Sequence, residues 1–259
     1  MFNLTPAAKN ILIVNGIIFF LTSQDLIEFL GMRYILSENF QPFQILTYMW
    51  VHANFSHLFS NMFAVLVFAP ILEKVWGSKK FLIFYLTTGI GAGILYCAVN
   101  FYETYKYEIQ TENYIENPNP ESFRRLVLDN VPEYYNQLYD FILDYSDNPQ
   151  NPNYIAESKE SASKLFKFKS DVPMVGASGA VFGILLAFAM LFPNMQLMLL
   201  IPPMPVKAKY LVLVYGIYEL WSEFSRIPGD NVAHLAHLGG MLIAYIILRY
   251  WKRKYGTYY

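Results

Sequence analysis

The sequence has few charged residues and almost no cysteine. Only 15% of its 259 residues are charged and 55% are hydrophobic, whereas about 25% of a typical soluble domain is charged. The single cysteine, Cys97 in the apolar run ILYCAVN, excludes an intrachain disulfide and a metal site built from several cysteines. The net charge of −1 gives no support to nucleic-acid binding. Several apolar windows approach the roughly 20 residues that cross a bilayer, which indicates an integral membrane protein.

Six segments are long and apolar enough to be predicted as membrane spans, so the expected fold class is an all-α bundle of six transmembrane helices. Their approximate ranges are 6–26, 54–72, 81–101, 175–192, 209–221 and 232–250. Gln24 and Asp25 weaken the first span, and Glu219 and Glu223 crowd the end of the fifth. The first apolar run lacks the small-residue cleavage site of a signal peptide, so we expect it to remain as a span.

The placement of lysine and arginine in short loops predicts the orientation. With a cytosolic N-terminus, the short outer loops hold only Arg33 and Arg226. The inner segments then hold Lys9, Lys74, Lys79, Lys80, Lys207, Lys209, Arg249, Lys252, Arg253 and Lys254. Both termini are therefore predicted to face the cytosol.

The third and fourth predicted spans are separated by a segment of different composition, residues 102–172, which is rich in Tyr, Asn, Pro and acidic residues. The predicted topology places it outside. Its amphipathic patterns, ESFRRLVLDNV and EYYNQLYDFILDY, predict two or three small helices packed on each other. We interpret residues 1–259 as a single domain with this insertion inside it. A structural cap and a gate over nearby chemistry both stay open as its role, and its partner is unknown.

Polar residues of three predicted spans fall in one layer. A rise of 1.5 Å per residue puts His57, Ser178 and His237 roughly 25, 22 and 18 Å above the inner boundary. All three therefore lie in the outer third of a hydrocarbon core about 30 Å thick. Within HANFSHLFSN, His57 and Asn61 are four residues apart and share one helical face.

Glycines flank the serine and the second of the two closely spaced histidines in this layer. Small residues let membrane helices approach closely, and such an approach allows a hydrogen bond between Ser178 and His237. Packing alone would need the glycines but not a serine and a histidine at equal depth. The glycines are Gly176, Gly179, Gly183, Gly239 and Gly240.

The layer contains the groups that acyl transfer requires. Serine becomes a nucleophile when an adjacent base accepts its proton, and histidine titrates in the right range. The available oxyanion donors are His57, the Asn61 amide and the backbone N–H of Ser178. Spans two, four and six carry no carboxylate at this depth, so we expect a Ser178–His237 dyad and not a triad.

Three motifs, HANFSHLFSN, GASGAVFG and AHLAHLGG, resemble those of the rhomboid family of intramembrane serine proteases. The likeness covers roughly residues 43–101 and 175–250, in family order. Each of the short motifs GxSG and AHxxG is by itself a weak sign of this family. Together with HxxxN, at the right intervals in a chain of six predicted spans, they are highly specific for it. The resemblance implies Ser178 as the nucleophile, His237 as the general base, and His57 and Asn61 as oxyanion-hole residues.

The same resemblance assigns supporting positions. Gly176 becomes the loop glycine ahead of the nucleophile, and Phe182 matches an aromatic residue that packs on the catalytic imidazole. Glu73 matches an acidic residue at the cytosolic end of the second span, where we expect it to fix loop structure. Phe43-Gln44 stand where relatives often carry Trp-Arg in the first outer loop, so the anchoring of that loop stays open.

The implied function is that of a serine-type endopeptidase of the EC 3.4.21 class, which cleaves transmembrane segments through an acyl-enzyme. Its substrates would be single-span or multi-span membrane proteins in the lipid bilayer, and no cofactor or metal is expected. Because a helix hides its carbonyls in hydrogen bonds, the substrate must unwind locally before attack. We expect the bacterial inner (cell) membrane, with the active site opening to the periplasmic or extracellular side.

Two other functions stay open. A catalytically inactive rhomboid-like protein would bind membrane proteins without cutting them. A membrane metal or haem site could use the histidines, although acidic partners are expected to be absent. AHxxG spacing favours His237 over His234 as the base, so we place His234 at the outer mouth, bonded to loop backbone, and assign His52 a structural role.

Overall fold

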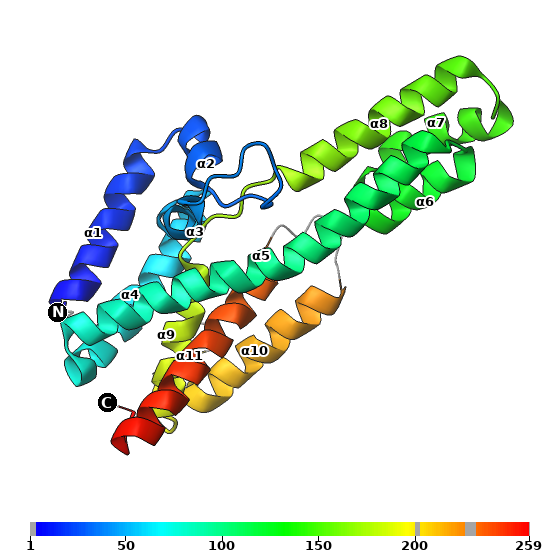
Figure 1. Ribbon diagram of the computed structural model, residues 1–259. Helices are drawn as coiled ribbons and strands as arrows, with labels where there is room; N and C mark the ends of the chain where they lie inside the picture. Colours follow the sequence, from blue (N-terminus) through cyan, green and yellow to red (C-terminus); the bar gives the residue numbers. More distant parts are fainter. Residues whose placement is uncertain (1–3, 200–202, 226–231, 259) are drawn as a thin grey trace.

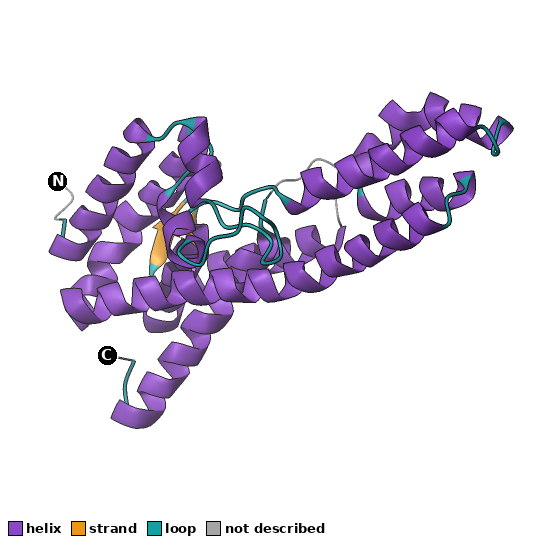
Figure 2. Cartoon of the chain, turned by 45° about the horizontal axis from the view of Figure 1, so that its top comes forward, coloured by secondary structure: helices purple, strands orange, loops and turns teal. Residues whose placement is uncertain are grey.

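The structure, a computed structural model, describes residues 4–199, 203–225 and 232–258. It is almost entirely helical, with one short strand pair (Figures 1 and 2). The helices are α1 (Pro6–Leu21), α2 (Gln24–Leu30), α3 (Gln44–Thr47), η1 (Tyr48–Trp50), α4 (Phe55–Trp76), α5 (Ser78–Glu116), α6 (Pro120–Asn130), η2 (Pro132–Tyr134), α7 (Tyr135–Asp147), α8 (Pro152–Ser170), α9 (Ser178–Leu191), α10 (Ala208–Ser225) and α11 (His234–Tyr255). Strands β1 (Gln196–Met198) and β2 (Pro205–Lys207) pair antiparallel, with Leu197 opposite Val206.

Each predicted span overlaps one long or apolar helix, in chain order α1, α4, α5, α9, α10 and α11, and the first span also takes in the start of α2. Among the described residues, α4 and α5 are long and apolar enough to cross a membrane, and α1 and α9 are shorter apolar helices. Both ends of the chain lie at the end of the bundle away from α6–α8 (Figure 1). An even number of crossings would have this consequence.

Helix α5 extends far beyond the predicted end of the third span at residue 101. It runs for 39 residues, to Glu116, and carries the chain from the bundle into the insertion (Figure 1). There its last turns pack against α6, α7 and α8 around a second hydrophobic core. This core contains Tyr107, Tyr114, Phe123, Leu126, Val127, Val131, Ile142, Tyr145 and Ala162.

Two Asn-Pro pairs explain where helices of the insertion begin. The Asn119 and Asn151 side chains cap α6 and α8 by accepting hydrogen bonds from backbone N–H groups of the first turn. Pro120 and Pro152 follow at the first helical position, where proline's missing N–H costs no intrahelical bond. The composition that separates this segment from the spans therefore also defines its helices.

Glycines bring α9 and α11 together in the bundle. A Cβ added to Gly240 would lie 1.9 Å from the carbonyl oxygen of Gly179, and one added to Gly183 would lie 2.2 Å from Cγ2 of Thr88. The first distance is far inside van der Waals contact, so α9 and α11 touch backbone to backbone, and the second shows that Gly183 makes room for Thr88 of α5. This is the close approach that the sequence predicts for small residues in membrane helices.

Glu73 joins the beginnings of α1 and α5. Its Oε1 and Oε2 accept hydrogen bonds of 2.9 Å from the backbone N–H groups of Ala7 and Ala8, in the first turn of α1. Thr5 also donates to Oε2, and the Ser78 hydroxyl donates to Oε1 at 2.6 Å. A carboxylate at a helix N-terminus satisfies free N–H groups and interacts favourably with the helix dipole.

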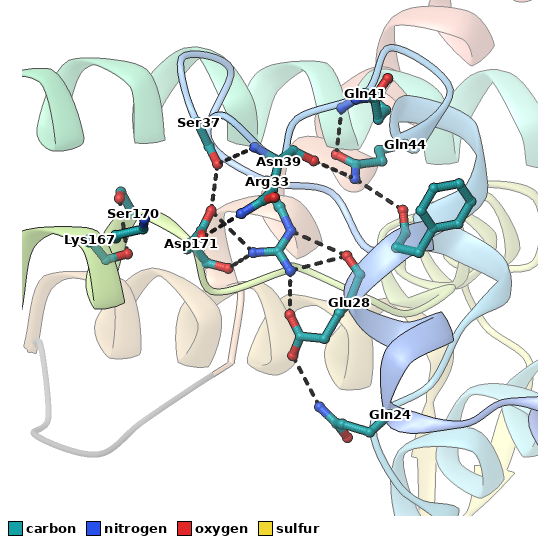
Figure 3. Close-up of polar contacts among 11 residues, drawn as sticks. Gln24, Glu28, Arg33, Ser37, Asn39, Gln41, Gln44, Lys167, Ser170 and Asp171 are labelled. Carbon is teal, nitrogen blue, oxygen red and sulfur yellow. Dashed lines mark hydrogen bonds and ion pairs between the residues drawn. The ribbon is translucent and has the colours of Figure 1, made fainter. Parts of the chain in front are cut away.

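The loop between α2 and α3, which the sequence predicts to be the first outer loop, is anchored by an ionic cluster (Figure 3). Arg33 is buried and pairs with Glu28 and, at 3.2 Å, with Asp171. Ser37 and Asn39 donate to the Asp171 carboxylate at 2.5 and 2.8 Å. Burial acts to raise the pKa of Asp171, but these hydrogen bonds and the Arg33 charge outweigh it and hold the pKa below its usual value. The cluster therefore fixes the loop to the segment that leads from α8 into α9.

Gln44, at the position where relatives often carry arginine, provides a second anchor for this loop. It is buried, and its Nε2 donates to the carbonyl oxygens of Phe29 at 3.1 Å and Asn39 at 3.2 Å. Its Oε1 accepts from the backbone N–H of Gln41 at 3.1 Å. The loop is thus held by different residues from those expected in the family.

Candidate active site

Ser178 and His237 meet in the structure. Ser178 is the first residue of α9 and His237 lies in the first turn of α11, where the backbones of the two helices touch. The Oγ of Ser178 lies 2.8 Å from Nε2 of His237, a hydrogen-bond distance. His237 is only 9% exposed and Ser178 is half-buried, so the contact is partly buried within the bundle.

Phe182 holds the plane of the His237 ring. The two rings stack with centroids 4.2 Å apart and planes 9° from parallel. Phe182 lies one turn after Ser178, so α9 carries both the hydroxyl and the surface on which its partner imidazole rests. The sequence predicted this aromatic contact from the resemblance.

The loop before Ser178 lies directly against His57. Gly176 has φ +118°, a backbone conformation that favours glycine, and a Cβ there would lie 2.5 Å from Cε1 and Nε2 of His57. The Gly176 N–H donates to the carbonyl of Tyr48 at 2.9 Å. The Ala177 N–H approaches Nε2 of His52 at 3.5 Å. His52 therefore supports this loop, in agreement with the structural role that the sequence indicated.

Asn61 has an unused hydrogen-bond donor. It is 4% exposed, and its Nδ2 has no hydrogen-bond partner within residues 4–199, 203–225 and 232–258. A buried unpaired amide costs free energy, so its persistence calls for an explanation. The Ser178 backbone N–H is also free of an intrahelical acceptor, because it opens α9.

A carboxylate that the sequence reasoning excluded lies behind His237. Glu219, 4% exposed on α10, has its Oε2 2.9 Å from Nδ1 of His237 and 2.5 Å from Nδ1 of His234. Spans two, four and six carry no carboxylate at this depth, but the fifth, which overlaps α10, supplies one. The signal was present in the sequence, since an ionisable residue within an apolar segment indicates function by default.

His234 differs correspondingly from its expected place. Its side chain is buried and its Nδ1 contacts a side-chain carboxylate, whereas we expected it at the outer mouth against loop backbone. Glu219, His234 and His237 also offer ligand atoms within 4.8 Å of one another, a spacing that could hold a divalent cation. The expectation that acidic partners are absent near the histidines is therefore wrong.

The fold and the site together define a class of protein: an apolar helical bundle that holds a serine–histidine pair in its interior, with spare hydrogen-bond donors around it. Such an arrangement can take a proton from a hydroxyl and receive a developing negative charge. The rhomboid domain model matches residues 39–107 and 156–253, more than half of the chain, and leaves 108–155 unmatched. The chain belongs to the rhomboid family and is an integral membrane protein.

Two curated relatives are similar to this chain over short stretches. "RHOMBOID-like protein 6, mitochondrial" of Arabidopsis thaliana is 38% identical over 55 residues, which cover 21% of this chain and 18% of the relative. "Putative rhomboid protease YdcA" of Bacillus subtilis (strain 168) is 36% identical over 52 residues, 20% of this chain and 26% of the relative. The matched stretches thus cover about a quarter or less of either relative.

Proposed function

We propose that the chain is an intramembrane serine endopeptidase, in which Ser178 is the nucleophile and His237 the general base. The observation that carries the proposal is the partly buried 2.8 Å contact between Ser178 Oγ and His237 Nε2. As Oγ attacks the substrate carbonyl carbon, its proton passes to Nε2. The imidazolium then protonates the leaving amine, an acyl-enzyme remains on Ser178, and water hydrolyses it.

The oxyanion hole is proposed to consist of His57, the Asn61 amide and the Ser178 N–H. The unpaired Nδ2 of Asn61 and the free N–H at the start of α9 support this assignment. Gly176 leaves room for the His57 ring beside the nucleophile. The developing charge would give the Asn61 amide and the Ser178 N–H an acceptor.

The proposed substrates are transmembrane segments of other membrane proteins. A segment with small or helix-breaking residues would expose its carbonyls most readily, because it unwinds at the lowest cost. The proposed topology has six crossings, both termini in the cytoplasm and the site opening to the periplasmic side of a bacterial inner membrane. Both chain ends lie at the same end of the bundle, and this supports an even number of crossings (Figure 1).

A fluorophosphonate probe tests the proposal directly. We expect the detergent-solubilised full chain to form one covalent adduct, which mass spectrometry locates on the peptide containing Ser178. Heat-denatured protein is the control, since an unfolded chain has no activated hydroxyl. A folded chain without an adduct, or with adducts spread over several serines, would contradict the proposal and favour an inactive membrane-protein binder.

The oxyanion role of Asn61 gives a graded prediction. Asn61→Ala is expected to lower kcat about 10²- to 10³-fold, the usual effect of losing one oxyanion donor. The neighbouring Ser60 donates to its own helix at the carbonyl of His57 and is exposed, so Ser60→Ala is the matched control. Cleavage of a model transmembrane peptide measures both variants, and equal kcat values would remove Asn61 from the site.

A further inference from the structure

Glu219 is the one carboxylate among the described residues whose oxygen contacts the proposed general base. Its Oε2 lies 2.9 Å from Nδ1 of His237, on the opposite side of the imidazole from Ser178. An ionised carboxylate only accepts hydrogen bonds, so this contact requires the His237 proton on Nδ1. The Nε2 lone pair then faces the Ser178 hydroxyl, which is the arrangement that a general base needs.

His234 holds the carboxylate in this position. Its Nδ1 lies 2.5 Å from the same oxygen of Glu219, and the Tyr218 ring packs edge-on against His234 with centroids 6.3 Å apart. A buried carboxylate is costly unless it is hydrogen-bonded, and two ring N–H groups on one oxygen offset that cost. The result is a carboxylate that cannot turn away from His237.

The His237 ring is thereby fixed from three sides. Phe182 stacks on its face, Ser178 contacts Nε2 and Glu219 contacts Nδ1. A carboxylate behind the base maintains the reactive tautomer and stabilises the imidazolium that forms when the base takes a proton. Each of these effects acts on the chemical step rather than on substrate binding.

We infer that Glu219 is a positioning residue for His237, which makes the site a Ser178–His237–Glu219 triad in which His234 supports the carboxylate. The inference rests on the proposed function. In the acylation step the Ser178 proton moves to Nε2, the bond from Oγ to the substrate carbon forms, and the carbonyl electron pair moves to its oxygen. Nδ1 keeps its proton, and Glu219 stays ionised throughout.

The test replaces Glu219 by glutamine in the full chain, in proteoliposomes with a model transmembrane peptide. Glutamine keeps the size of the side chain but can donate to Nδ1, which favours the wrong tautomer. We expect kcat to fall at least about 10²-fold, since a comparable change in a serine protease triad costs about 10⁴. KM should remain within about twofold of the wild-type value, because uniform substrate binding is untouched.

Ser222→Ala is the matched control. Ser222 is also buried on α10, one turn beyond Glu219, and the hydrogen bonds of the His237 ring within the described residues go to Glu219 and Ser178, so replacing Ser222 should leave kcat unchanged. If Glu219→Gln does not fold, Glu219→Asp provides the second variant, because it keeps the charge and withdraws the oxygen from Nδ1. A folded variant with the kcat of the wild type would overturn the inference.

An experiment with a chelator distinguishes the positioning role of Glu219 from a metal site formed by Glu219, His234 and His237. Activity of the wild type should survive dialysis against a chelator, and added zinc should not raise it. Loss on dialysis with recovery on zinc addition would overturn the positioning role. Failure of the proposed function looks different, because the wild type itself would then neither cleave the peptide nor react with the probe.

Discussion

Replacing Ser178 by alanine is expected to lower kcat for a transmembrane peptide about 10⁶-fold, and His237→Ala is expected to lower it by nearly as much. The two groups act as one unit, because the 2.8 Å contact lets the imidazole remove the hydroxyl proton during attack. Without the base the hydroxyl is a poor nucleophile, and without the hydroxyl the base has nothing to activate.

The double variant gives the sharper measurement. Because either change disables the same step, Ser178→Ala/His237→Ala should be no slower than the single variants, with residual cleavage from the oxyanion donors alone. Burst-phase kinetics in the wild type report the acyl-enzyme, and unfolding midpoints show whether the variants are folded. Multiplicative losses in the double variant, or cleavage by folded Ser178→Ala at the wild-type rate, would refute the mechanism.

The sequence predicted the serine–histidine pair because depth in a membrane can be counted along a helix. A rise of about 1.5 Å per residue and a hydrophobic boundary locate a polar side chain without knowledge of its neighbours. The same reasoning missed Glu219, which lies near the end of α10. Its depth was obscured by the second acidic residue, Glu223, and only the structure shows that its carboxylate turns toward His237.

The fold was predictable where a helix ends at the same residue as the apolar segment that it contains, and less so elsewhere. Hydropathy indicates where a helix leaves the membrane, but α5 continues to Glu116 because Tyr107 and Tyr114 pack in the hydrophobic core of the insertion. The β1–β2 pair is too short to give a periodic signal. Anchoring of the loop between α2 and α3 depends on the pairing of Arg33 with Asp171, residues 138 positions apart, which no local pattern predicts.

Gly240→Ala is expected to be the most damaging single-methyl change in the bundle. The added Cβ would lie 1.9 Å from the carbonyl oxygen of Gly179, and that oxygen belongs to a helix backbone and cannot rotate away. Overpacking a core costs about 1–3 kcal/mol even where side chains can yield. We expect at least the upper end of that range here, with a clear drop in the unfolding midpoint.

The same change should also disable the site in molecules that still fold. Separating α9 from α11 moves Ser178 away from His237, and a misplacement of about 1 Å can cost about 10²-fold in rate. Gly239→Ala is the matched control on the adjacent residue, because its Cβ would meet Ala92 at an ordinary 3.4 Å. It should keep the stability and probe reactivity of the wild type. If the two variants behave alike, backbone contact between these helices is not what brings the serine to the histidine.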